Sequence, residues 1–266
     1  MSAALSRAAG GLGRAAGLTL RRLRVQAPAW VLPLWALAAA TPSYESVYPS
    51  PEARTMLIEA MRTNAGTRLL YGVLPLPGTV GQLAQWEINT YLVVYTGLMA
   101  VLLTCRTLRT NKNEGLVELL RGAGAGRWTP LLASLGVVAG IVALHAAGVG
   151  VIMTALTGSV EELTVRGAWA LAGVVAVVGW ALMGVSAVAC QLARDAGGAR
   201  GASLGALGVA FALRAAADDA DAPWLRWLSP IAWRDLVESY TADRPVPLVV
   251  AVVVCRRNWG TAGSRR

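Results

Sequence analysis

The chain has 266 residues, of which 55% are hydrophobic and only 15% are charged, and its mean hydropathy is +0.52. A soluble domain of this length carries about 25% charged residues. This composition excludes a disordered chain and argues against an ordinary water-soluble enzyme, so the first question is how the chain crosses a membrane.

The leader, residues 1–24, carries five arginines and no acidic residue. At about 100° per residue, its leucines and alanines fall on one face of a helix and its arginines on the opposite face. This pattern predicts a cytoplasmic amphipathic helix at the membrane surface. Four glycines in the leader leave open the alternative of an unfolded basic segment. We expect the first span to follow it without cleavage.

Charged residues mark the ends of the hydrophobic segments, because a charge at the centre of a bilayer costs roughly 2.5 to 3.5 kcal/mol. The fold class predicted in this way is an all-α integral membrane protein with about six transmembrane helices. Two of them, the last two, are expected to be short or re-entrant, since a full crossing takes about 20 apolar residues. The transmembrane domain covers 25–255, with spans at about 25–44, 88–105, 130–156, 168–191, 201–217 and 245–255.

The first two spans are joined by a long loop, 45–87, which we expect outside the cytoplasm. A Pro-Glu pair after Ser50 predicts a short helix there. Residues 69–86 hold several glycines, prolines and glutamines and are predicted to be loop. Two acidic pairs, Glu161-Glu162 and Asp218-Asp219, fall in outer loops, where we expect them to be solvated.

The connections between spans differ in charge. The leader, the loop 106–129, the fourth connection and the tail 256–266 together hold 16 basic and 3 acidic residues, whereas the other connections hold 8 basic and 12 acidic residues. Because basic residues concentrate in cytoplasmic loops, both termini are predicted to be cytoplasmic. This alternation favours contact with anionic lipid over binding to nucleic acid.

The cytoplasmic loop 106–129 contains a candidate helix. Asn111 or Asn113 can cap a helix that runs to Leu120, and a glycine-rich stretch ends it. Its leucines share one face that would otherwise be exposed. The pattern therefore predicts a protein partner for this loop.

Polar and small residues inside the spans suggest two further sites. His145, the only histidine, lies near the middle of the third span. An ionisable residue at that depth is a functional candidate by default, for cargo contact or proton relay. The favoured alternative is a neutral histidine that hydrogen-bonds to another helix. The pairs Gly136/Gly140 and Gly201/Gly205 have the spacing of close helix contacts, with packing inside the chain favoured over contact between chains.

The sequence lacks the patterns of catalytic and cofactor sites. Cys105, Cys190 and Cys255 are far apart in sequence and lie near inner span ends, which favours free thiols over a disulfide or a zinc site. There is no phosphate-binding loop and no cluster of catalytic residues. We therefore expect no enzyme activity, metal or cofactor in this chain.

The segment 113–127, with the sequence NEGLVELLRGAGAGR, resembles a characteristic stretch of bacterial ABC exporter permeases of the polyketide-antibiotic (tetronasin-like) group. Further similar stretches follow the order of that family over roughly residues 20 to 245; they are 48–54, 70–72, 200–202, 211–214 and 227–233. Members of the family usually have two six-span halves in a chain about twice this length. The chain therefore resembles one half of such a permease.

The resemblance implies a function. In that family the loop between the second and third spans is a coupling helix that docks on a separate ATPase subunit, so the implied docking residues are Glu114, Glu118, Leu119, Leu120, Arg121 and Arg127. It implies a permease subunit of an ATP-driven exporter in the bacterial plasma membrane, which moves hydrophobic antibiotics or drug-like compounds out of the cell. ATP hydrolysis would take place on the separate subunit, and a second permease half or a second copy would complete the pathway. The shortened last span leaves the alternative of a non-transporting or truncated fragment that acts as a membrane scaffold.

Overall fold

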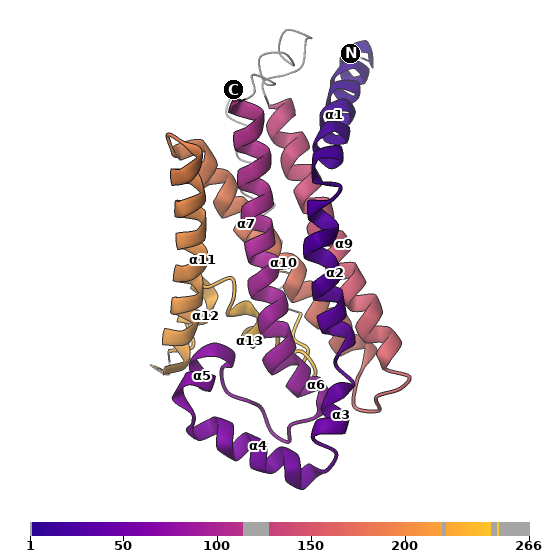
Figure 1. Cartoon of the computed structure of the whole chain (residues 1–266), viewed down its shortest axis with the longest axis vertical. Coiled ribbons are helices and arrows are strands. Elements are labelled where there is room, and N and C mark those ends of the chain that lie inside the picture. The colour runs from indigo at the N-terminus through magenta and orange to yellow at the C-terminus, as the bar shows by residue number, and fades with distance from the viewer. Residues whose placement is uncertain (1, 114–127, 220–221, 246–248, 250–266) are drawn as a thin grey trace.

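The computed structural model describes residues 2–113, 128–219, 222–245 and 249 (Figure 1). All regular structure in these ranges is helical. Four helical stretches are long and apolar enough to cross a membrane: Val80–Arg109, Thr129–Leu156, Val165–Leu192 and Ala196–Asp218. The chain is therefore an all-α, multi-pass membrane protein, and the predicted fold class is confirmed. Of the sixth predicted span, 245–255, only Pro245 and Val249 lie among the described residues.

Three long helices form the centre of the bundle: α7 (Asn89–Asn113), α9 (Thr129–Leu156) and α10 (Val165–Leu192), with α10 packed along both of the others. Gly97 and Gly179 allow this close packing. A Cβ atom added at Gly97 would lie 2.4 Å from Leu182 Cδ1, and one added at Gly179 would lie 2.6 Å from Val142 Cγ1. Small residues at such positions let membrane helices approach closely.

Two helices precede the central three. Helix α1 (Ser2–Leu23) and helix α2 (Gln26–Ala39) run almost in line, and both pack against α9 (Figure 1). The leader is thus helical, as predicted, and Leu23 at its end is fully buried. Its position at the membrane surface stays a prediction. Helix α2 ends at Ala39, so it is shorter than the predicted span 25–44.

Helix α11 (Ala196–Asp219) lies at the other side of the bundle and is longer than the predicted span 201–217. Arg200 lay just before the predicted span, but it lies inside the helix, as Arg214 does. At its C-terminal end Arg214 is buried and paired, so this charge does not end the helix. By length and composition α11 is able to cross the membrane.

The region 45–87 contains several helices. Helix α3 (Ser43–Val47) is followed by α4 (Pro51–Thr63), α5 (Ala65–Tyr71) and α6 (Val80–Leu83), and a π-helical turn, η1 (Ala84–Ile88), leads into α7. As predicted, α4 begins after Ser50, whose hydroxyl accepts a hydrogen bond from the Ala53 N–H at 3.2 Å. Two short helices, α12 (Leu225–Leu228) and α13 (Trp233–Val237), lie near the far end of α11.

The prediction that residues 69–86 are all loop is wrong at both ends, because residues 69–71 belong to α5 and residues 80–86 to α6 and η1. Thr79 and Gln82 form a capping box that starts α6. The glutamines do not oppose helix formation, because they have specific partners. Gln82 Oε1 accepts hydrogen bonds from the N–H groups of Gly78 and Thr79, and Gln85 Nε2 donates to the Arg234 carbonyl at 3.0 Å.

Candidate functional site

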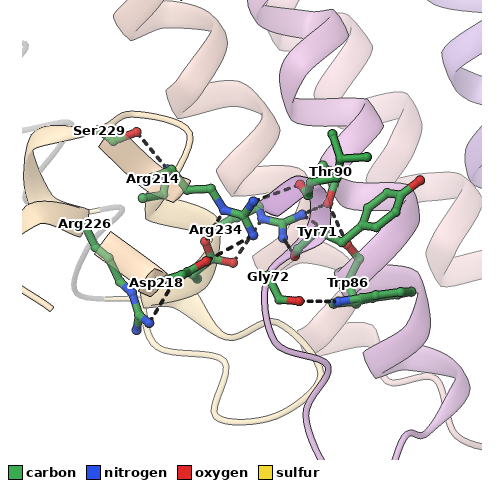
Figure 2. A network of polar contacts seen from close by, with 12 residues as sticks. Tyr71, Gly72, Trp86, Thr90, Arg214, Asp218, Arg226, Ser229 and Arg234 are labelled. Atoms are coloured by element: carbon green, nitrogen blue, oxygen red, sulfur yellow. Dashed lines mark hydrogen bonds and ion pairs between the residues drawn. The ribbon is translucent and has the colours of Figure 1, made fainter. Parts of the chain in front are cut away.

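Two buried arginines lie where the ends of α5, α11 and α13 meet the beginning of α7 (Figure 2). Arg214 and Arg234 each have side chains that are only 1% exposed. Charged residues are almost never fully buried unless they are paired. We name Arg214, Arg226, Arg234, Asp218 and Asp235 the arginine cluster.

Arg214 lies on α11, and its guanidinium reaches the end of α5. Its Nη1 atom donates hydrogen bonds to the carbonyl oxygens of Leu69 and Leu70 at 3.0 and 2.8 Å. The same side chain forms ion pairs with Asp218 Oδ2 at 3.4 Å and with Asp235 Oδ2 at 3.3 Å. Arg214 therefore connects α5 to α11 and α13.

Arg234 lies on α13, and its guanidinium reaches the beginning of α7. It donates to the Trp86 carbonyl at 3.2 Å and also to the Thr90 hydroxyl and the Tyr71 carbonyl. Its Nε atom pairs with Asp235 Oδ1 at 3.0 Å. Burial lowers the pKa of the Arg234 guanidinium to about 10, although the Asp235 charge opposes this shift. The group therefore stays protonated at neutral pH.

Local backbone geometry explains why arginines are needed at this position. Helix α5 ends at Gly72, which has a φ of +84°. The last carbonyl groups of a helix have no partner within the helix, so they need other donors. Arg214 and Arg234 supply them, and a Cβ atom at position 72 would lie 2.3 Å from Arg214 Nη2. Only glycine fits here without moving the arginine.

Two of the acidic residues that were expected to be solvated, Glu162 and Asp218, are bonded instead. The Asp218 side chain is 11% exposed and accepts a hydrogen bond from Arg226 Nη2 at 3.0 Å. Glu162 accepts from Arg54 Nη1 at 2.7 Å and from the Val80 N–H at 2.6 Å. Burial alone would raise the pKa of Glu162, but these hydrogen bonds and the Arg54 charge hold it below its ordinary value. The sequence could not show the partners of Glu162, because they come from a distant segment.

His145 is fully buried between α7 and α9. Its Nε2 atom lies 3.0 Å from Thr96 Oγ1 on α7, and its backbone carbonyl accepts a hydrogen bond from Trp35 Nε1 at 3.1 Å. A ring with no exposed surface does not contact cargo in this conformation. The geometry favours the structural alternative, a neutral hydrogen bond between helices.

A line of tyrosines on α7 was missed by the sequence reasoning. The rings of Tyr91 and Tyr95 are stacked with centroids 6.3 Å apart, and Tyr71 packs edge-on against Tyr91 at 5.8 Å. Tyr95 is 43% exposed although it lies well inside a membrane-crossing helix. Tyrosines four residues apart share a helix face, which is the signal that the sequence offered.

The two glycine pairs do not make the close contacts that were expected inside the chain. A Cβ atom added at Gly136, Gly140, Gly201 or Gly205 would meet no atom within 4 Å among the described residues. Within the part of the chain that the structure describes, the prediction that these pairs pack inside the chain is therefore wrong. They lie on faces that the described residues leave open.

The predicted docking residues Glu114, Glu118, Leu119, Leu120, Arg121 and Arg127 lie outside the described residues. Their segment joins α7 to α9. The structure therefore shows where the segment begins and ends, and the docking role stays a prediction.

Comparison with known proteins gives one informative similarity. No protein-family model matches the chain. The chain is 33% identical, over 235 residues, to a protein named multidrug efflux system permease protein Rv1217c from Mycobacterium tuberculosis. The aligned region covers 85% of this chain but only 40% of that relative. The chain thus spans less than half the length of the curated relative that it matches.

Proposed function

We propose that this chain is a transmembrane permease subunit of an ATP-driven ABC exporter, which moves hydrophobic antibiotics or drug-like compounds out of the cell. The observation that carries the proposal is the similarity to a multidrug efflux permease over 85% of the chain. Four membrane-crossing helices support it. The resemblance of the segment 113–127 to a coupling helix supports the tetronasin-like group and a separate ATPase subunit.

The proposed pathway needs a second six-span unit, supplied by another permease half or by a second copy. Helix α11 supports this requirement. In the apolar 18-residue part of α11 only 22% of the residues are buried inside the structure, whereas 72% are buried in the corresponding part of Val80–Arg109. Its open positions include Gly201, Gly205 and Gly208, at which an added Cβ atom would meet no atom of the described residues. Small residues are enriched where membrane helices contact each other.

Helix α7 connects the proposed ATPase-docking segment at one end of the bundle to the arginine cluster at the other end. Its C-terminal end leads into the segment 114–127, where we propose that the ATPase docks on the cytoplasmic side. Its beginning is bonded to the arginine cluster through Thr90 and the Trp86 carbonyl. A displacement of α7 by ATPase closure would therefore change the bonds of Arg234 at the far end of the bundle.

We further propose that the exposed Tyr95 of α7 lines the cargo route. Tyr95 presents an aromatic ring and a hydroxyl group on an open face of the helix. Such a side chain suits amphiphilic compounds that carry both apolar and hydrogen-bonding groups. Tyr95→Ala would then weaken transport of aromatic cargo more than it weakens assembly with the ATPase.

The test is to co-express the chain with the ABC ATPases of its source organism, purify the complex that forms and measure ATP hydrolysis stimulated by cargo in lipid nanodiscs. Glu118→Ala combined with Arg121→Ala is expected to lower both co-purification and stimulated hydrolysis at least several-fold. A matched control is Glu59→Ala combined with Arg62→Ala, which has the same spacing on exposed positions of α4.

The docking assignment is wrong if the double variant at 118 and 121 assembles and hydrolyses ATP like the unaltered protein. If no ATPase associates with the chain at all, the alternative of a non-transporting membrane scaffold is favoured.

A further inference from the structure

Two cysteines that are 85 residues apart in sequence lie next to each other near the end of the bundle where α7 leads into the segment 114–127. Cys105 lies on α7 and Cys190 on α10, and both are buried. Their Sγ atoms are 3.6 Å apart, and both cysteines are free. The prediction of free thiols is therefore confirmed for Cys105 and Cys190. Their spacing of 85 residues did not indicate that they are neighbours.

From this geometry we infer that Cys105 and Cys190 form a reversible oxidation site, at which a disulfide cross-links α7 to α10. A disulfide has an S–S distance of about 2.05 Å, so each sulfur needs to move by only about 0.8 Å. Helices α7 and α10 already pack closely along their length. Closure of the bond thus requires a side-chain adjustment rather than a rearrangement of the helices.

The surroundings of the pair favour thiol chemistry. The Cys190 S–H donates to Cys105 Sγ, and Cys105 also lies 3.4 Å from Ser203 Oγ on α11. Arg109, one turn after Cys105, donates to the Ala193 carbonyl, which lies about one turn after Cys190. A fixed positive charge near a thiol promotes its reaction as thiolate. Arg106, next to Cys105 in sequence, is exposed, so the pair lies near the end of the apolar part of α7.

The oxidant class that we name is a peroxide. Cys105 attacks hydrogen peroxide, forming a sulfenic acid and releasing one water. The Cys190 thiol then attacks the sulfenic sulfur, forming the disulfide and releasing a second water. Two thiols are oxidised by two electrons in total, one peroxide is reduced, and an external thiol reverses the reaction.

The disulfide would fix the spacing of α7 and α10 at the end of the bundle where α7 leads into the segment 114–127. This restriction does not depend on the transport function proposed above. The proposed oxidation is tested by chemistry on the chain itself, without transport or ATP hydrolysis. A failure of the oxidation proposal is therefore distinguishable from a failure of the proposed function.

The experiment treats the full-length chain in lipid nanodiscs with hydrogen peroxide and then with a maleimide-linked polyethylene glycol. The chain has three cysteines. Labelling under denaturing conditions is expected to fall from three sites to one after oxidation and to return to three after dithiothreitol. Peptide mass spectrometry is expected to find the peptide containing Cys105 linked to the one containing Cys190.

Three single variants make the result decisive. Cys255→Ser, which alters the cysteine outside the described residues, is expected to keep the cross-link. Cys105→Ser and Cys190→Ser are expected to lose it while migrating normally on gel filtration. The inference is overturned if peroxide leaves all three sites open to labelling, or if the cross-link involves Cys255 or joins two chains.

Discussion

The arginine cluster and His145 are both buried polar sites, yet they are built differently. Arg214 and Arg234 carry full charges and have several partners each, including carboxylates from α11 and α13. His145 makes one side-chain hydrogen bond, to Thr96, in the middle of the bundle. A neutral ring suffices for a single link between helices, whereas a buried guanidinium is tolerated only where carboxylates and carbonyl groups surround it.

This difference indicates which of the two sites holds its helices together more firmly. The arginine cluster joins four segments of the chain, two within residues 69–90 and two within residues 214–235. Any movement that separates them has to break several charge-assisted hydrogen bonds at once. The bond between His145 and Thr96 is a single hydrogen bond between helices, and its loss costs much less.

Arg234→Ala is expected to have the largest effect. It removes the donor to the Trp86 and Tyr71 carbonyls and leaves Asp235 without one of its two cations. Truncating one member of a buried ion pair costs about 3 to 5 kcal/mol in the free energy of unfolding. The measurement is unfolding by sodium dodecyl sulfate in mixed micelles.

Arg244→Ala is the matched control for Arg234→Ala. Arg244 pairs with Glu238 at 3.4 Å, but its side chain is 61% exposed. An exposed pair of this kind contributes about 0 to 1 kcal/mol. If the two variants lose equal stability, the arginine cluster does not close this end of the bundle.

The sequence allowed the helical class to be predicted, because long uncharged segments are visible without any knowledge of contacts. Predicted limits of 130–156 and 168–191 compare with observed helices at Thr129–Leu156 and Val165–Leu192. Prediction failed where polar residues are bonded to distant partners. Gln82 and Gln85 were interpreted as part of a loop, yet both lie within helical segments.

Neither the arginine cluster nor the pair of Cys105 and Cys190 could be predicted, and the reason is the same for both. Their members lie on different helices, and no spacing in the sequence connects them. Only the pair Arg214 and Asp218, four residues apart on one helix, offered a local signal. The docking segment shows the opposite case, since its pattern is plain in the sequence but its residues lie outside those that the structure describes.

Gly148→Val is expected to have the second largest effect, through the packing of α2 on α9. A Cβ atom at position 148 would lie 2.2 Å from the Trp35 ring, whose N–H donates to the His145 carbonyl. The ring has to move, so we expect a loss of about 1 to 3 kcal/mol in the same unfolding assay. Gly140→Val on the same helix is the control, because an added Cβ there meets no described atom within 4 Å. Equal losses would show that α2 does not pack on α9 in this way.

His145→Phe is expected to cost about 1 kcal/mol, much less than Arg234→Ala. It removes one hydrogen bond between helices, and such bonds in membrane proteins average about 0.6 kcal/mol. A double-mutant cycle with Thr96→Val measures the coupling between the two side chains. If His145→Phe abolishes transport while its stability stays within this range, the proton relay or cargo contact is favoured over the structural role.

Glu162→Gln is expected to have the smallest effect, and one that depends on pH. The Glu162 carboxylate pairs with Arg54 and accepts from the Val80 N–H, so its pKa in the folded chain is lowered from the ordinary value of 4.5. A lowered pKa stabilises the fold above the unfolded value, and this contribution is lost as the pH falls through the folded value. Because the side chain is 36% exposed, solvent screening limits the contribution to below about 1 kcal/mol.

We expect unaltered and Glu162→Gln chains to differ in unfolding free energy at pH 7 and to converge as the pH falls below about 4.5. Arg54→Met should reproduce the loss at pH 7, whereas Arg62→Met, on the same helix but exposed, should not. A difference that grows on acidification would mean that the carboxylate is destabilising, and that the contact between α4 and the α9–α10 connection is held by other groups.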